Sequence, residues 1–167
     1  MKIGLISDTH GFLDARYREY FSQSDEIWHL GDVGSKEIIE ELEAFRPTRV
    51  VYGNIDGQDV RVRSEEVLFV EIGSQRFLLI HIAGKPGSYT KQVRALINKK
   101  KPTVLICGHS HILKVMKDEK YNLLYMNPGA AGRQGFHKVR TLLRFEITAA
   151  GLENLEVIEL GSRSAIR

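Results

Sequence analysis

Two histidines separated by one residue are the most suggestive chemical feature of this sequence. His109 and His111 follow Gly108, directly after the apolar run Val104-Leu105-Ile106-Cys107. The run is typical of a short buried strand that ends where the polar residues begin. In extended chain, residues i and i+2 project to the same side, so the two imidazoles would face one space and start a metal site. For an isolated pair, a structural role at a strand end is the better expectation.

Four other apolar runs end in a residue that can bind a metal. Each run is typical of a strand, and the residue after it carries a carboxylate, an amide or an imidazole. The residues are Asp8 and His10 after the run 2–7, Asp32 after 26–30, Asn54 after 49–52, and His81 after 77–80. In open α/β sheets, ligands bind beyond the carboxyl ends of the strands. We therefore expect these five strand ends to converge on one crevice.

The types of these side chains indicate which ions they would bind. Carboxylate, amide and imidazole donors without any cysteine suit divalent ions such as manganese, iron, zinc, nickel or cobalt. The full set is larger than one ion usually needs and fits two ions that share one carboxylate. It consists of Asp8, His10, Asp32, Asn54, His81, His109 and His111.

Helices alternate with strands in the first half of the chain. We expect a helix over about Asp14 to Ser22, with Tyr17, Tyr20 and Phe21 at helical spacing. We expect a second helix from Ser35, a good N-cap, to just before Pro47, and a third over about Tyr89 to Lys99. Such a succession of strand, helix and strand predicts a parallel sheet.

Strands dominate the rest of the chain. Residues 67–72 and 76–80 predict a hairpin around Gly73-Ser74-Gln75. Strands are also expected over 113–116, 123–126, 139–147 and 155–160. A tail made only of strands predicts a second sheet packed on the first, with the helices outside. We expect residues 1–167 to form a single domain of α/β class.

The composition is that of an ordinary globular chain of 167 residues, with 43% hydrophobic and 27% charged residues. A net charge of +3 from 24 basic and 21 acidic residues indicates a mixed surface rather than a nucleic-acid footprint, so nucleic acid is not indicated beyond nucleotides as substrates. The basic cluster Lys99-Lys100-Lys101 is explained by a helix end. Cys107 is expected to be a small core residue, and a single cysteine fits a reducing compartment. Without a signal peptide or a membrane span, we expect a cytoplasmic protein.

The ordered motifs resemble those of the calcineurin-like metallophosphoesterases. Asp8-x-His10, Gly31-Asp32, Gly53-Asn54, His81 and Gly108-His109-x-His111 follow the order of that family, and Asn127-Pro128-Gly129-Ala130 extends the likeness. The short chain is most similar to the single-domain bacterial and archaeal phosphodiesterases. The resemblance implies a four-layer α/β/β/α sandwich of two mixed sheets flanked by helices. It also implies hydrolysis of phosphodiesters, or of phosphomonoesters, and a small phosphate ester as substrate.

By this resemblance, one metal ion would be held by Asp8, His10, Asp32 and His111. The second would be held by Asp32, Asn54, His81 and His109, with Asp32 as the bridge. Two cations roughly 3.5–4 Å apart can bind a phosphoryl oxygen, generate a hydroxide and offset charge during in-line displacement. We expect two divalent ions, manganese first, with nickel, zinc, iron, cobalt or magnesium as alternatives. Related small members associate, so a homo-oligomer is also expected.

The sequence departs from the family pattern at two places. Many members have a histidine after the Gly-Asn pair, where it can protonate the leaving group, whereas this chain has Ile55 followed by Asp56. We include Asp56 with Asp32 and Asn54 as candidate catalytic residues; it would donate the proton, orient a ligand or shape the turn. After His81, the usual His-Gly-His is replaced by a Gly/Pro loop that contains Lys85. Lys85 and Arg133 are candidate substrate contacts.

Other interpretations predict different behaviour. The chain could be a non-catalytic scaffold with the same fold, which the complete ligand set opposes. It could also be a mononuclear hydrolase, which the bridging Asp32 and the additional Asn54 oppose. Of the remaining histidines, His29 is expected to pack in the core or at a sheet edge. His137 is expected at the surface, and both are left out of the site.

Overall fold

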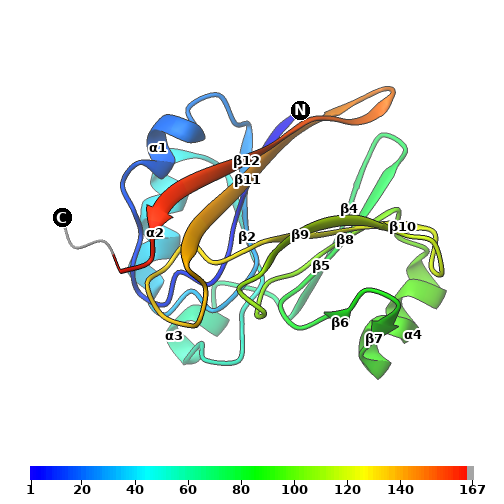
Figure 1. Ribbon diagram of the computed structural model, residues 1–167, viewed down its shortest axis with the longest axis horizontal. Helices are drawn as coiled ribbons and strands as arrows, with labels where there is room; N and C mark the ends of the chain where they lie inside the picture. Colours follow the sequence, from blue (N-terminus) through cyan, green and yellow to red (C-terminus); the bar gives the residue numbers. More distant parts are fainter. Residues whose placement is uncertain (165–167) are drawn as a thin grey trace.

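The computed structural model describes residues 1–164 and contains two five-stranded mixed sheets with helices outside them (Figure 1). The first sheet has the order β12-β11-β1-β2-β3, made of β1 (Lys2–Ile6), β2 (Glu26–His29), β3 (Thr48–Val50), β11 (Val139–Thr148) and β12 (Gly151–Ser162). The second has the order β4-β5-β8-β10-β9, made of β4 (Val67–Ile72), β5 (Gln75–Ile80), β8 (Val104–Ile106), β9 (Leu113–Asp118) and β10 (Leu123–Pro128).

The four layers are held together by three apolar clusters. Between the sheets, the rings of Trp28, Phe77 and Phe145 contact one another, with centroids 5.1 to 6.2 Å apart. A second cluster joins the first sheet to α1 (Tyr17–Tyr20), α2 (Lys36–Phe45) and α3 (Gln58–Arg61). A third joins the second sheet to α4 (Lys91–Lys100). The predicted α/β/β/α sandwich is confirmed.

Parallel strands bring the ends of the predicted ligand-bearing strands together. β1, β2 and β3 are parallel neighbours in the first sheet, and β5 and β8 are parallel neighbours in the second. Parallel neighbours end at the same edge of their sheet. Beyond these ends, Gly108 N donates to His81 O and continues the pairing of β8 with β5 inside the second sheet. A contact between the two sheets is made by Ala131 N, after β10, which donates to Ser7 O, after β1.

The last two strands lie elsewhere than expected. We predicted that the strands of the tail would build the second sheet, but β11 pairs antiparallel with β1, and β12 pairs with β11. They therefore complete the first sheet, and the second is built from β4, β5, β8, β9 and β10. The periodicity of a strand indicates which of its faces is buried, whereas its partner depends on contacts distant in sequence.

Helix boundaries also differ from the expectation. α1 covers only Tyr17–Tyr20, because Asp14 binds the Arg16 and Arg140 guanidinium groups and so fixes the preceding turn to the sheet. α2 begins after Ser35 as predicted, although the Ser35 side chain makes no capping hydrogen bond. α4 begins after Thr90, whose hydroxyl accepts from Val93 N, and Tyr89 belongs to a short ribbon of β6 (Gly84–Lys85) and β7 (Ser88–Tyr89).

The structure tests two expectations drawn from the composition, the burial of Cys107 and the position of the basic cluster. Cys107 is buried, its thiol donates to the Tyr125 hydroxyl at 3.0 Å, and burial raises its pKa to about 12, as expected of an inert core cysteine. Lys99 and Lys100 form the last turn of α4, so the position of the basic cluster at a helix end is confirmed. Within residues 1–164, none of the helices has the length and apolar character needed to cross a membrane.

Candidate metal centre

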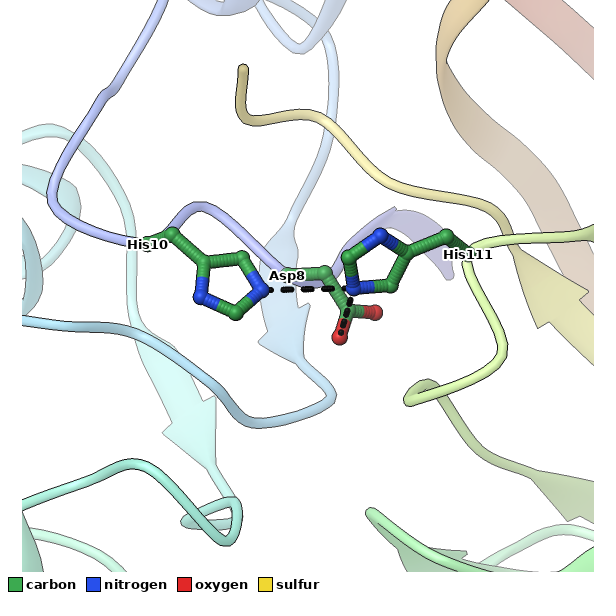
Figure 2. Close-up of side chains that lie close together, drawn as sticks. All are labelled: Asp8, His10 and His111. Carbon is green, nitrogen blue, oxygen red and sulfur yellow. Dashed lines mark hydrogen bonds and ion pairs between the residues drawn. The ribbon is translucent and has the colours of Figure 1, made fainter. Parts of the chain in front are cut away.

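The first group of converging ligands consists of Asp8, His10 and His111 (Figure 2). Their donor atoms lie within 4.8 Å of one another. His111 Nε2 is 3.2 Å from Asp8 Oδ1 and 3.2 Å from His10 Nε2. Asp8 is fully buried and the two imidazoles are partly buried. A buried carboxylate and two imidazole nitrogens facing the same point form a ligand set for a divalent cation.

Asp8 is held in position by hydrogen-bond donors from two neighbouring residues. The Ser7 hydroxyl donates to Oδ2 at 2.6 Å, and the backbone N–H of His109 lies 3.2 and 3.1 Å from the two oxygens. Gly108 permits this approach, because a Cβ there would lie 2.1 Å from Ser7 Oγ. The ends of β1 and β8 are therefore locked together at the ligand itself.

The second group consists of Asp32, His81 and His109, again with donor atoms within 4.8 Å of one another. Asp32 and His81 are buried, whereas His109 is exposed. His81 Nδ1 must donate to Leu30 O, at 2.7 Å, which leaves Nε2 free to bind a cation. Nε2 lies 3.2 Å from Asp32 Oδ1 without hydrogen-bond geometry, so this buried nitrogen has no hydrogen-bond partner among residues 1–164.

Asp32 contacts both groups. One carboxylate oxygen faces His81 Nε2 at 3.2 Å, and the other lies 3.8 Å from His10 Nε2. Burial alone would raise the pKa of Asp32, but the neighbouring His81 and the Ile55 N–H hold the pKa below its usual value. The carboxylate therefore stays charged and is placed between the two groups.

The imidazoles of the second group differ in their tendency to take up a proton. Burial would lower the pKa of His81, but the nearby carboxylates of Asp32 and Asp8 raise it overall. Burial and the neighbouring His81 lower the pKa of His109. Of these two residues, His109 therefore more readily offers a neutral ring nitrogen as a ligand.

Most of the candidate ligands have an uncommon backbone conformation. Asp8, His10, Asp32, His109 and His111 have positive φ angles between 48° and 67°. Left-handed conformation is uncommon for residues other than glycine and costs on the order of 1 to 3 kcal/mol where the surroundings impose it. Such strain is concentrated at functional sites, which is consistent with a ligand cluster at these loops.

The positive φ angles correct one prediction. We expected His109 and His111 to project into one space from extended chain, but neither residue is extended. His109 joins Asp32 and His81, while His111 joins Asp8 and His10. The left-handed turn at each histidine sends neighbouring imidazoles to different groups, and periodicity along a strand cannot predict this.

Asn54 and its neighbours form the loop that supports Asp32. Asn54 is exposed and lines a cavity beside His81, while the Ile55 N–H donates to Asp32 Oδ1 at 3.1 Å. Gly53 must lack a side chain, since a Cβ there would lie 2.0 Å from Asp32 Oδ1. The loop therefore binds Asp32 through backbone and leaves the Asn54 side chain open to the crevice.

Asp56 is buried between the loop that carries Asp32 and the loop that carries Asn54. Its carboxylate accepts from the backbone N–H groups of Val33, Gly34 and Gly53 at 3.1, 2.8 and 2.7 Å. A buried carboxylate with three N–H donors is an acceptor, so these contacts oppose the predicted role of Asp56 as a proton donor. They favour the alternative that it orients the loops carrying Asp32 and Asn54.

The two predicted substrate contacts do not lie among the converging ligands. Lys85 is exposed in β6, and its side chain makes no hydrogen bond or ion pair with the part of the chain that is described. The Arg133 guanidinium lies over the Phe12 ring, 4.0 Å from its centroid, beside a cavity that none of the seven candidate ligands lines. Substrate binding by these two residues stays a prediction.

His29 has a supporting role that sequence patterns did not indicate. It is fully buried in the core, as expected, and its Nδ1 accepts from Gly31 N while Nε2 pairs with the Thr9 hydroxyl at 2.9 Å. Thr9 in turn donates to Val33 O. The neutral ring ties the loop that carries Asp8 and His10 to the loop that carries Asp32, and burial lowers its pKa to about 4.

His137 was expected at the surface and is partly exposed, but it also contacts the site, which was not expected. Its ring packs edge-on against His111, with centroids 5.2 Å apart, and its Nε2 lies 3.1 Å from Gly132 O. Nδ1 is buried without a hydrogen-bond partner in residues 1–164. The loop returning from β10 to β11 brings His137 to the site, and no local motif marks it.

Asn127, which sequence comparison gave only as part of a family likeness, secures the loop that carries His109 and His111. Its amide donates to Gly108 O at 2.8 Å and to Ser110 Oγ at 3.1 Å, and its carbonyl accepts from Gly129 N. The one sequence signal that could have indicated this role is an asparagine directly after an apolar, strand-like run.

Comparisons with known proteins agree with this geometry. The family model described as the calcineurin-like phosphoesterase superfamily domain matches residues 1–150. A probable metallophosphoesterase of Methanothermobacter thermautotrophicus is 33% identical over 137 residues, which cover 78% of this chain and 77% of the relative. The solved structure of an archaeal phosphodiesterase is similar with a TM-score of 0.74 and 25% identity, covering 96% of this chain and all (100%) of that one.

The same fold also occurs in Vps29 of Chaetomium thermophilum, with a TM-score of 0.77 at 17% identity over 98% of this chain and 99% of that one. At this identity the likeness extends to the fold alone. Together, the fold, the two ligand groups and the relatives define a metal-dependent phosphoesterase. The chain belongs to the calcineurin-like phosphoesterase superfamily, among its small archaeal and bacterial members.

Proposed function

We propose that this protein hydrolyses phosphodiesters at a centre that holds two divalent metal ions. The observation that carries the proposal is the position of Asp32, whose two oxygens lie 3.2 Å from His81 Nε2 and 3.8 Å from His10 Nε2. One carboxylate between two ligand groups is what a pair of ions needs as a bridge. A single ion would need only one of the groups.

The residues fit such ions. Asp8, His10, Asp32 and His111 would hold one ion, and Asp32, Asn54, His81 and His109 would hold the other. The buried Nε2 of His81, which lacks a hydrogen-bond partner among the described residues, and the adjacent buried carboxylates are the groups that a cation would satisfy. When bound, two divalent ions activate water and offset charge on the phosphoryl oxygens.

The protein's own groups keep the ligands oriented but supply no proton to the leaving group from the loop after Asn54. Ile55 has no acidic proton on its side chain, and the carboxylate of Asp56 is bound by three N–H groups. The attacking water releases one proton to solvent as its oxygen bonds to phosphorus, the P–O bond to the leaving group breaks, and the departing oxygen takes a proton from solvent. Diesters with good leaving groups are therefore the preferred substrates.

The test is a metal titration coupled to hydrolysis. Protein freed of metal by a chelator is titrated with manganese, nickel, zinc, cobalt, iron(II) or magnesium, and the bound ions are counted by mass spectrometry. We expect two ions per chain, manganese as the best activator, and faster release of nitrophenolate from bis(p-nitrophenyl) phosphate than from p-nitrophenyl phosphate. One ion per active chain would support a mononuclear hydrolase instead. Binding without hydrolysis under all metals would support a non-catalytic scaffold.

A further inference from the structure

A groove of about 330 Å³ opens beside the second ligand group. It lies between the loop after β3, the start of β4, the end of β5 and the first turn of α4. Its size is at the lower end of the range of small-molecule sites, which suits one organic group of an ester. We call it the Glu66 groove, and the lining residues used below are Tyr52, Asn54, Arg61, Glu66, His81 and Gln92.

The groove begins at the candidate metal centre. Asn54 and His81, two of the proposed ligands of one ion, are part of its wall. A phosphoryl group bound at the ions therefore has this groove as a neighbouring space for one of its ester groups. The first ligand group is covered differently, since the ring of His137 packs edge-on against His111.

Glu66 provides a negative charge in this groove that no cation pairs with. Its two carboxylate oxygens accept from Gln92 Nε2 at 2.9 Å and from the Tyr52 hydroxyl at 3.4 Å, both of which are neutral donors. Among residues 1–164 no Lys, Arg or His forms an ion pair with it. The carboxylate can accept further hydrogen bonds from a ligand, and it repels an anion.

The positively charged residue that lines the groove, Arg61, is held in place by contacts with neighbouring residues. Arg61 Nε donates to Asp56 O at 2.7 Å, one terminal nitrogen lies 3.5 Å from Gly53 O, and the guanidinium packs over the Tyr52 ring at 4.4 Å. These contacts hold Arg61 against the loop that carries Asn54. They use two of the five N–H donors of Arg61 and fix its position, whereas each oxygen of Glu66 accepts one hydrogen bond and can accept another.

We infer that the Glu66 groove binds the organic group of the phosphate ester and selects groups that are uncharged and carry hydroxyls, such as a nucleoside. The inference rests on the proposed function and adds the substrate class. Hydroxyl groups donate to the Glu66 carboxylate, and a substrate with a second phosphate on the same organic group brings two negative charges together. Selection arises from this repulsion as well as from the new hydrogen bonds.

The experiment compares two chromogenic diesters with the same leaving group. These are the p-nitrophenyl ester of thymidine 5′-phosphate and the same ester with an additional 3′-phosphate, assayed with manganese at low ionic strength. We expect Glu66→Gln to lower the preference in kcat/KM for the uncharged ester about threefold to fivefold, mainly through KM, as expected for an exposed charge. Gln92→Glu adds a carboxylate and should raise the preference. Added salt should weaken the preference of the unmodified protein.

The matched control is Glu65→Gln, which removes the neighbouring exposed carboxylate outside the groove and should leave the preference unchanged. An unchanged preference in both Glu66→Gln and Gln92→Glu overturns the inference. Hydrolysis of bis(p-nitrophenyl) phosphate by the unmodified protein tests the proposed function separately. If that hydrolysis is absent, calorimetric binding of thymidine 5′-monophosphate against the 3′,5′-bisphosphate to the same variants decides the inference alone.

Discussion

The two ligand groups have the same composition but different surroundings. Each combines one buried aspartate with two imidazoles in edge-on contact, with ring centroids 5.2 Å apart in both. In the first group, Asp8 receives hydrogen bonds from Ser7 and from the backbone of His109, and His137 covers His111. In the second, His109 is exposed and His81 borders the Glu66 groove. The first group is therefore the more enclosed of the two, whereas the second opens onto the groove.

The largest effect is expected from a substitution of Asp32, the residue that the two ligand groups share. Asp32→Asn keeps the size of the side chain but replaces one negatively charged oxygen with an amide nitrogen. We expect metal-dependent diester hydrolysis to fall by more than about 100-fold, beyond the usual loss for an outer-shell partner of a ligand. Circular dichroism should show an intact fold. Asp59→Asn in α3 removes an exposed carboxylate nearby and should retain activity; near-normal activity in Asp32→Asn would refute the bridge.

The next effect concerns His29, which ties the two loops together. Its pKa in the folded protein is about 4, against 6.5 for a free imidazole, because it is buried and neutral. Below pH 6.5 the His29 side chain binds a proton in the unfolded chain but stays neutral in the folded chain until the pH approaches 4. Stability from this group is therefore complete above pH 6.5 and is lost as the pH falls toward 4, by about 3 kcal/mol in total.

Urea unfolding of the metal-free protein across this pH window measures the loss. His29→Gln cannot titrate, so its free energy of unfolding should fall less between about pH 7 and pH 4 than that of the unmodified protein. Equal falls in the two proteins would show that His29 does not contribute. Chelator is present throughout, because metal binding would add its own dependence on pH.

A pair of glycine substitutions should separate the two groups. A Cβ at Gly135 would lie 2.1 Å from His111 Nδ1, and one at Gly31 would lie 2.6 Å from His81 Nδ1. Gly135→Ala should weaken binding at the first group only and Gly31→Ala at the second only, each by about tenfold or more. The displaced rings should also cost about 1 to 3 kcal/mol of stability.

Metal titration of each variant tests this separation, and Gly73→Ala is the control. Gly73 also has a positive φ, of 59°, but a Cβ there meets nothing within 4 Å. It therefore carries the backbone strain without touching either group and should still bind two ions. Loss of both ions from either variant would show that the two groups are one cooperative unit.

The smallest expected effect is that of His137. His137→Phe keeps a ring against His111 but removes the buried Nδ1, so we expect metal affinity at the first group to change by less than about tenfold. His137→Ala also removes the ring and should have a larger effect. If the two variants behave alike, the nitrogen rather than the packing supports His111.

Much of the fold follows from local patterns. The apolar runs at 2–7, 26–30 and 77–80 predicted strands, and β1, β2 and β5 lie within or close to them. The hairpin and α4 were also predicted within a residue or two. Three features were not predicted: the sheet that β11 and β12 join, the short length of α1, and the ribbon of β6 and β7. Each depends on contacts beyond the local sequence pattern.

The sequence by itself determined the candidate ligands and their order, since a strand that ends in a carboxylate, an amide or an imidazole is a local pattern. The two groups in the structure are those that the family resemblance implied, but local patterns alone do not predict them, because Asp8 and His111 are distant in sequence and left-handed turns send His109 and His111 apart. The same holds for Asp56, His29 and His137, whose roles depend on backbone atoms and rings of other loops. Residue types indicate which chemistry is available, whereas long-range packing fixes where each donor atom lies.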